Sequence, residues 1–263
     1  MLSSRVATAV ALLTIFVSAL LYLPNLWWKL FLLPLLVGAS WEWGSLLKLS
    51  AAGRWGFCAL TVGSALALEM TAATALYAPV IGTSCVFWIL LVPAWLCTQW
   101  RARSLPVLVF AGWLTLVPSW WALGELQVRP GELLALLGVV WLMDTGAYLV
   151  GRAWGRHKLA AVISPGKTWE GVAGGTATVA VYYLVLSWSL PDWHWWASGK
   201  GVTLFFCVTV ASVIGDLLES WVKRQAGVKD SGTLLPGHGG ILDRIDSMTS
   251  SLPVAAALLL VIA

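Results

Sequence analysis

Long apolar stretches separated by short polar connections make up most of this chain. Nine of them reach roughly the 20 residues that an α-helix needs to cross the hydrocarbon core of a bilayer. They predict an all-α fold, a polytopic integral membrane bundle of about nine transmembrane helices. The predicted spans are 5–23, 27–47, 56–77, 80–98, 105–122, 132–150, 171–190, 201–221 and 247–263. The fourth is the least regular, because Pro79 and Pro93 interrupt it. The first could instead be a signal peptide, but its length favours an uncleaved span.

The composition agrees with a membrane protein. Of the 263 residues, 59% are hydrophobic and 11% are charged, whereas a soluble domain has about 45–50% apolar and about 25% charged residues. The 19 Trp residues fit the same class, since Trp collects at membrane–water interfaces. The net charge of +4 indicates basic cytoplasmic loops and anionic lipid, and no nucleic acid partner is expected.

One membrane domain, 1–263, is the expected organisation, because no soluble stretch is long enough to fold separately. Residues 1–131 supply N-terminal helices, and residues 132–263 supply the helices and cytoplasmic loops that carry the candidate catalytic groups. With the N-terminus on the cytoplasmic side, thirteen of the sixteen Lys and Arg residues lie on that side. This bias is the positive-inside pattern, and it predicts a cytoplasmic N-terminus and an external C-terminus.

The densest polar stretch lies between the last two predicted spans, from Ser220 to Asp246. The part around Pro236–Gly240 is rich in Gly and Pro, which predicts a loop. Arg can hold phosphate oxygens bidentately and Lys as a point charge, so this loop is a candidate phosphate site. His238 is a candidate metal ligand, phosphate donor or acid/base, or else a structural loop histidine. The candidate groups of this stretch, apart from its carboxylates at 243 and 246, are Ser220, Lys223, Arg224, Lys229, Asp230, His238 and Arg244.

Several acids are expected at one depth near the cytoplasmic helix ends. Ionised carboxylates inside a membrane usually face a partner, a cavity or a metal ion. Mg²⁺ suits a site with few carboxylates plus substrate phosphates. Alternatively, an acid of the eighth span pairs with a Lys or Arg from a neighbouring helix. The candidate metal ligands are Asp144, Asp216, Asp243 and Asp246. The roles of Glu42, Glu69 and Glu219 stay open, and an interhelical hydrogen bond is at least as well supported as catalysis for the first two.

The segment before the seventh span predicts an anion-binding helix start. Ser164 precedes Pro165, which is typical of the first residues of a helix. Exposed N–H groups at such a start bind anions, and Lys167 adds a full charge. A capped helix with an interfacial Lys is the alternative. Gly171 and Gly175 form a Gly-x-x-x-Gly pair, which indicates close helix packing.

These residues carry a resemblance to a known family. Ser-x-Val-Lys-Arg-x₄-Lys-Asp-x-Gly-x₂-Leu-Pro-x-His-Gly-Gly-Ile-x-Asp-Arg-Ile-Asp, from Ser220 to Asp246, resembles the signature of the phosphatidate cytidylyltransferase (CDP-diacylglycerol synthase) family without a departure. The stretches that begin at Asp144 and Ser164 resemble the same family. The likeness is clearest over residues 140–263, and in the first half it is mostly one of hydropathy.

The resemblance implies an integral membrane enzyme that joins CTP and phosphatidate to give CDP-diacylglycerol and pyrophosphate. It implies dependence on Mg²⁺, with a second cation as an open addition, and a homodimer in a bacterial inner membrane with the site facing the cytoplasm. It also implies that Asp216 and Asp243 hold the metal centre, to which Asp246 and Asp144 are added here. The reaction fits the residues, because two anions must meet and no Ser–His or Cys–His arrangement is needed.

Three other functions are considered for the same spans and acids. A transporter has both, but it does not account for the cation-rich loop, and no inverted repeat is evident. A CTP-dependent enzyme that acts on another membrane lipid differs only in the apolar walls that hold the lipid. A structural lipid-binding scaffold is disfavoured by several acids at one depth.

Overall fold

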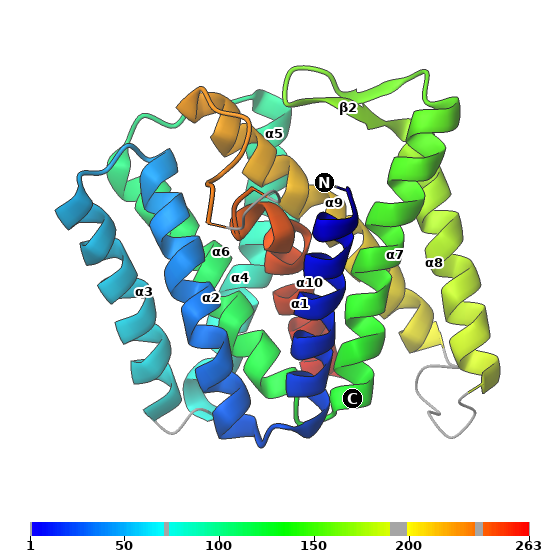
Figure 1. Ribbon diagram of the computed structural model, residues 1–263, viewed down its shortest axis with the longest axis horizontal. Coiled ribbons are helices and arrows are strands. Elements are labelled where there is room, and N and C mark those ends of the chain that lie inside the picture. The colour runs from blue at the N-terminus through cyan, green and yellow to red at the C-terminus, as the bar shows by residue number, and fades with distance from the viewer. Residues whose placement is uncertain (1, 71–73, 190–198, 235–238, 263) are drawn as a thin grey trace.

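Helices account for almost all of the regular structure (Figure 1). The computed structural model describes residues 2–70, 74–189, 199–234 and 239–262. The helical segments are α1 (Leu2–Tyr22), α2 (Asn25–Leu46), α3 (Ala51–Met70), α4 (Thr74–Val86), the π-helical η1 (Phe87–Leu91), α5 (Val92–Thr98), α6 (Leu105–Leu126), α7 (Pro130–Trp154), α8 (Trp169–Ser189), α9 (Gly199–Ala226) and α10 (Leu242–Ile262). One two-stranded hairpin joins α7 to α8: β1 (Lys158–Ala160) and β2 (Ser164–Thr168).

The predicted all-α membrane fold is confirmed, and the predicted number of spans is not. The described residues of the predicted stretches are almost all helical, and the fourth covers α4, η1 and α5 in succession. The third, 56–77, runs past the end of α3 at Met70 and into α4, which begins at Thr74. Within the described residues, seven helices are long and apolar enough to cross a membrane. α2 is not among these seven helices. In α1, the part whose side chains are described, Val10–Tyr22, is apolar but shorter than a full span.

The π-helical segment η1 has a local cause. Pro93 lies just after it and has no N–H to donate to the carbonyl four residues earlier, inside η1. A π-turn absorbs such a mismatch without ending the helix. Trp88 of η1 is buried, with Phe87 beside it in an edge-to-face contact.

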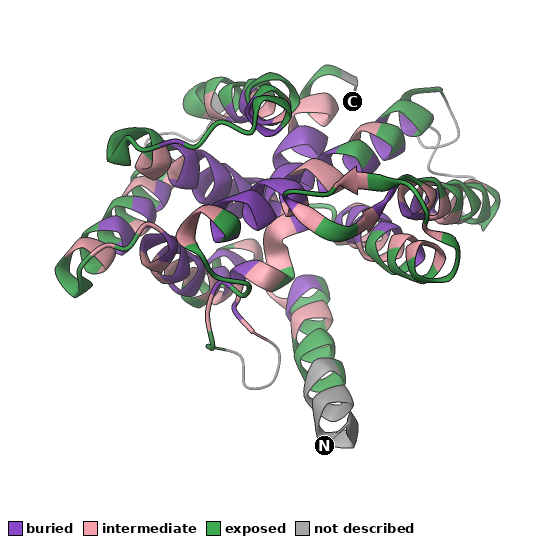
Figure 2. Cartoon of the chain, turned by 90° about the horizontal axis from the view of Figure 1, so that it is seen from above, coloured by how far each residue is buried: buried purple, intermediate pink, exposed green. Residues whose placement is uncertain are grey.

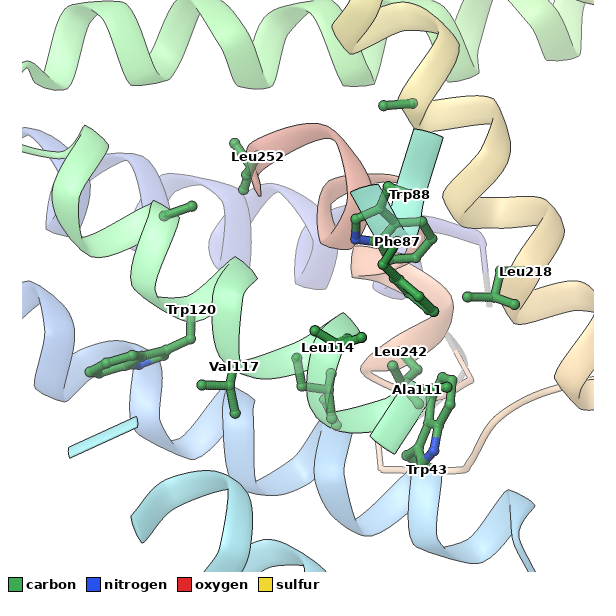
Figure 3. Packing of buried hydrophobic residues seen from close by; sticks show 14 of the residues in the cluster. Trp43, Phe87, Trp88, Ala111, Leu114, Val117, Trp120, Leu218, Leu242 and Leu252 are labelled. Atoms are coloured by element: carbon green, nitrogen blue, oxygen red, sulfur yellow. The ribbon is translucent and has the colours of Figure 1, made fainter. Parts of the chain in front are cut away.

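α10 lies at the centre of the bundle and packs against α9, α6, α4, α7 and α2. Figure 3 shows the apolar core around it, with Phe87 and Trp88 of η1 near Leu218 of α9 and Leu242 of α10. Figure 2 shows that burial is concentrated along the middle of the molecule, whereas the outer helices expose apolar faces. The core therefore fixes the first turn of α10, which carries polar residues.

α7 and α8 pack closely because small residues line their contact. A Cβ at Gly171 would lie 2.7 Å from the carbonyl oxygen of Ala147, and one at Gly175 would lie 2.6 Å from that of Met143. The interpretation of this Gly pair as a helix-packing motif is confirmed. α9 passes behind α7 and crosses the pair at an angle (Figure 1), which leaves space between the three helices at the end that carries the hairpin.

The predicted helix start at Ser164–Pro165 is wrong. These residues begin β2, which pairs antiparallel with β1 in the register Ala160↔Ser164 and Lys158↔Thr168. The helix begins at Trp169, and Thr168 Oγ1 accepts a hydrogen bond from the Gly171 N–H at 3.1 Å. A residue before Pro is driven towards extended backbone, and here a neighbouring strand stabilises that conformation.

A buried ion cluster ties three helices together at the opposite end of the bundle. Lys29 Nζ of α2 lies 2.7 Å from Glu69 Oε1 of α3 and 2.8 Å from Glu125 Oε1 of α6. The Lys29 side chain is 7% exposed. Glu69 therefore makes the interhelical bond that was one of its two sequence interpretations.

Replacing Lys29 by Met is expected to destabilise the protein by about 3 kcal/mol, because it leaves two partly buried carboxylates without their cation. The measurement is thermal or denaturant unfolding in detergent. The triple variant Lys29→Met, Glu69→Gln, Glu125→Gln should recover most of the loss, since it removes the excess charge. An unchanged stability of the single variant would contradict this role.

Candidate active site

A cavity of about 560 Å³ lies beneath the hairpin, between α7, α8, α9 and the start of α10. All four predicted metal-ligand positions line it: Asp144, Asp216, Asp243 and Asp246. They come from three helices that are separated by many residues in the sequence. These four carboxylates, which are distant in the sequence, therefore line one cavity.

The remaining walls of the cavity differ in polarity. β2 contributes Ser164, Lys167 and Thr168, so both phosphate-site candidates of this segment face the acids although the segment is a strand. An apolar wall comes from the helices behind it: Met143, Ala147, Val172 and Val213. The cavity can therefore receive a charged group and an apolar chain side by side.

Three of the acids make few contacts with the protein. Asp216 Oδ2 lies 2.5 Å from Lys167 Nζ, and its Oδ1 accepts a hydrogen bond from Ser220 Oγ at 3.3 Å. Asp144 Oδ1 accepts one from Ser247 Oγ at 3.3 Å, and Asp246 Oδ1 accepts one from the Ser247 N–H at 2.8 Å. Carboxylates with so few partners retain oxygen lone pairs for a ligand.

Asp243 is held much more firmly. Lys223 Nζ lies 2.6 Å from Asp243 Oδ1 and also forms an ion pair with Glu219 one turn earlier on α9. Asp243 Oδ2 accepts hydrogen bonds from the N–H groups of Ser231 and Gly240, both at 2.9 Å. This carboxylate joins α9, the following loop and α10, so its place in the cavity is fixed by its own contacts.

Glu42 of α2 anchors the same loop from the other half of the chain. Its Oε1 accepts a hydrogen bond from the Ile241 N–H at 3.0 Å, and its Oε2 accepts one from the Leu242 N–H at 2.9 Å. The Ser231 hydroxyl lies 3.0 Å from both Glu42 Oε2 and Asp243 Oδ2. Glu42 is 2% exposed and does not line the cavity, so it satisfies the N–H groups at the start of α10 and so positions Asp243.

The described residues among the other catalytic candidates do not line the cavity. Arg224 is exposed and donates to the carbonyl oxygens of Ile163 at 3.4 Å and Val228 at 3.2 Å, so it links α9 to the hairpin and the loop. Lys229, Asp230 and Arg244 are exposed. His238 lies outside the described residues.

Tyr148 and Arg152 of α7 also line the cavity, and neither was selected as a candidate from the sequence. Arg152 Nη1 donates a hydrogen bond to Tyr148 Oη at 2.8 Å. They follow Asp144 at offsets of four and eight, which places the three side chains on one helix face. That spacing is the sequence signal that could have found them.

The donor set of the cavity suits a hard divalent cation. Four carboxylates line the wall, and the lysines directly paired with them are Lys167 and Lys223. Within the described residues, no three acidic, His or Cys side chains already form a metal site. Mg²⁺ does not need such a cage, because it is commonly held by one or two carboxylates together with water and substrate phosphates.

Comparison with known proteins assigns the chain to a family. The model of the cytidylyltransferase family matches residues 3–262. The phosphatidate cytidylyltransferase of Pseudomonas aeruginosa is 37% identical over 98% of this chain and 97% of its own length. The phosphatidate cytidylyltransferase of Haemophilus influenzae is 42% identical over 59% of this chain and 57% of its own length. That of Brucella suis is 46% identical over 63% of this chain and 59% of its own length. An integral membrane chain that matches this model over nearly its whole length, and whose four acids converge in one cavity, belongs to the cytidylyltransferase family.

Proposed function

We propose that the protein is a phosphatidate cytidylyltransferase, which transfers CMP from CTP to phosphatidate and releases pyrophosphate. The observation that carries this proposal is the cavity with one acidic side, one basic strand and one apolar wall. Phosphatidate needs both a phosphate site and an apolar wall, and CTP needs a site that tolerates several negative charges. The bacterial relatives that carry the same activity name support the same substrates.

The reaction joins two anions in one displacement. A phosphate oxygen of phosphatidate forms a new bond to the α-phosphorus of CTP, and the bond from that phosphorus to the bridging oxygen breaks. The electron pair leaves with pyrophosphate. The attacking oxygen is already anionic near neutral pH, so the protein needs to supply little base catalysis. Its contribution is alignment and neutralisation of charge.

The residues of the cavity divide this work. Lys167 is paired with Asp216 and lies on β2 beside Ser164, so it is placed to exchange its carboxylate partner for a substrate phosphate. The apolar wall that includes Met143 and Val213 is placed to hold the first carbons of the lipid chains. Lys223 keeps Asp243 in position and does not itself line the cavity.

A divalent cation, Mg²⁺, is part of the proposal, with a second cation as an addition. Asp216, Asp246 and Asp144 would hold it, because they line the cavity and keep free lone pairs, and Asp243 would complete the set. When bound, Mg²⁺ would neutralise the phosphates and stabilise the leaving pyrophosphate.

The proposed setting is a bacterial inner membrane, with nine spans, the cavity open to the cytoplasm and two copies of the chain in a homodimer. The connections α2–α3 and α5–α6, the segment from the last turn of α7 through the hairpin, and the end of α9 lie at one end of the bundle (Figure 1). Nine of the sixteen Lys and Arg residues fall in these segments: Lys48, Arg101, Arg103, Arg152, Arg156, Lys158, Lys167, Lys223 and Arg224. The positive-inside pattern then directs this end to the cytoplasm.

The purified protein in mixed micelles is expected to convert CTP and phosphatidate to CDP-diacylglycerol and pyrophosphate only with Mg²⁺ present. The measurement is pyrophosphate release together with detection of the lipid product, with EDTA as the control. Pyrophosphate release with a polyprenyl phosphate but not with phosphatidate would support the other-lipid alternative. Movement of substrate across sealed vesicles without pyrophosphate release would make the protein a transporter and overturn the proposal.

A further inference from the structure

The cation at the rim of the cavity is Arg152, in the last turn of α7. The other cation of the cavity wall, Lys167, is already paired with Asp216. Arg152 instead donates to a neutral phenol oxygen, and no carboxylate of the described residues lies within ion-pair distance of it. Its charge is therefore available to an anionic ligand of the cavity.

Asp144, Tyr148 and Arg152 form a ladder along α7. Successive members are four residues apart, so the ladder spans about 12 Å at the helical rise of about 1.5 Å per residue. All three side chains are exposed and line the cavity. One end of the ladder is a carboxylate among the acids, and the other is a guanidinium in the last turn of α7. The length suits an extended polyphosphate chain that begins at the acids and runs towards Arg152.

Tyr148 restricts the orientation of this guanidinium. Its hydroxyl accepts the hydrogen bond from Arg152 Nη1, and the guanidinium carbon lies 5.9 Å from the centre of its ring. One edge of the planar Arg152 guanidinium is thereby occupied, and its other N–H groups remain for a ligand. A guanidinium with its second edge free matches the paired oxygens of a phosphate.

We propose that Arg152 binds the terminal phosphates of the nucleotide, the part that leaves as pyrophosphate, and that the Tyr148 hydroxyl holds its guanidinium in place. This inference rests on the proposed function. The phosphate of a lipid headgroup has the same chemistry, but the apolar wall that suits a lipid is buried or half-buried, whereas Arg152 is exposed. That wall consists of Met143, Ala147, Val172 and Val213. The water-soluble substrate is the one that meets the exposed rim.

The test compares Arg152→Gln, Arg152→Lys and Tyr148→Phe with the unaltered protein. Binding of Mg²⁺–pyrophosphate is measured by calorimetry without lipid, and steady-state kinetics give the KM for CTP and for phosphatidate. Loss of a charge-assisted contact should weaken pyrophosphate binding and raise the KM for CTP by about tenfold or more in Arg152→Gln. Arg152→Lys should recover only part of the pyrophosphate affinity that Arg152→Gln loses. Tyr148→Phe should also weaken pyrophosphate binding and raise the KM for CTP, but by less than Arg152→Gln.

The controls separate this site from other uses of a rim arginine. CMP binding and the KM for phosphatidate should stay within about twofold, since neither ligand carries the terminal phosphates. Arg103→Gln, at an exposed arginine away from the cavity, should leave every value unchanged. Unchanged pyrophosphate binding in Arg152→Gln overturns the inference, as does a rise in the KM for phosphatidate alone, which would assign Arg152 to the lipid headgroup. Because calorimetry needs no turnover, it also separates failure of this inference from failure of the proposed activity.

Discussion

Replacing Asp216 by Asn is expected to lower turnover by about a hundred- to a thousandfold while the protein still folds. Asn has nearly the same shape as Asp but no negative charge, so it is a poor ligand for a hard cation. Among the described residues, Asp216 makes only a hydrogen bond with Ser220 and an ion pair with Lys167, so little of the fold depends on it. The variant also releases Lys167 for substrate phosphates. We therefore expect the KM for CTP to remain unchanged or to decrease, while kcat decreases strongly.

The measurement is pyrophosphate release with unfolding in detergent as the control for folding. Glu132→Gln is the matched variant, because it also turns a carboxylate into an amide, in an ion pair of half-buried Glu132 with exposed Arg129 at the far end of α7. It should retain full activity. Asp243→Asn is a less clean test, since Asp243 also holds Ser231 and Gly240, and it should lose stability as well as turnover. Full activity of Asp216→Asn would remove Asp216 from the metal site.

The helices could be predicted from the sequence because a membrane segment must satisfy its own backbone hydrogen bonds, and apolar length then nearly suffices. The acids could also be predicted, since carboxylates are costly in apolar helices and have few structural reasons to be there. Asp144 and Asp216 are examples, and the cavity unites them. Both kinds of inference use signals that lie within one helix.

The predictions that failed concern contacts between one segment and another, which the pattern within a single segment does not show. Ser164–Pro165 has the same local pattern as a helix start, and only the pairing with β1 decides for a strand. Arg224 belongs to the same charged motif as Lys223, yet it points to backbone carbonyls of the hairpin and the loop. A motif gives residue types in order, whereas the direction of each side chain depends on what packs against its helix.

Glu42 shows this limit most clearly, since its partners lie about 190 residues further along the chain. Removing it is the second large effect we expect. Glu42→Ala leaves the N–H groups of Ile241 and Leu242 without their acceptor in a buried place, at a cost of about 1–3 kcal/mol for each buried group left unsatisfied. The first turn of α10 should loosen, and Asp243 and Asp246 with it. Turnover should fall by about a hundredfold, because small misplacements of catalytic groups have effects of that size.

Three measurements distinguish this positioning role from general destabilisation. Hydrogen exchange should accelerate at Gly240, Ile241 and Leu242 while the amides in the middle of α7 stay protected. The fall should appear in kcat, with the KM for CTP changed much less, since the rim at Arg152 does not touch Glu42. Ser231→Ala should produce a smaller loss, and combining it with Glu42→Ala should add little, because both act on one hydrogen-bonded unit. Full additivity, or loss of kcat without faster exchange at the start of α10, would show that Glu42 acts by another route than the loop it holds.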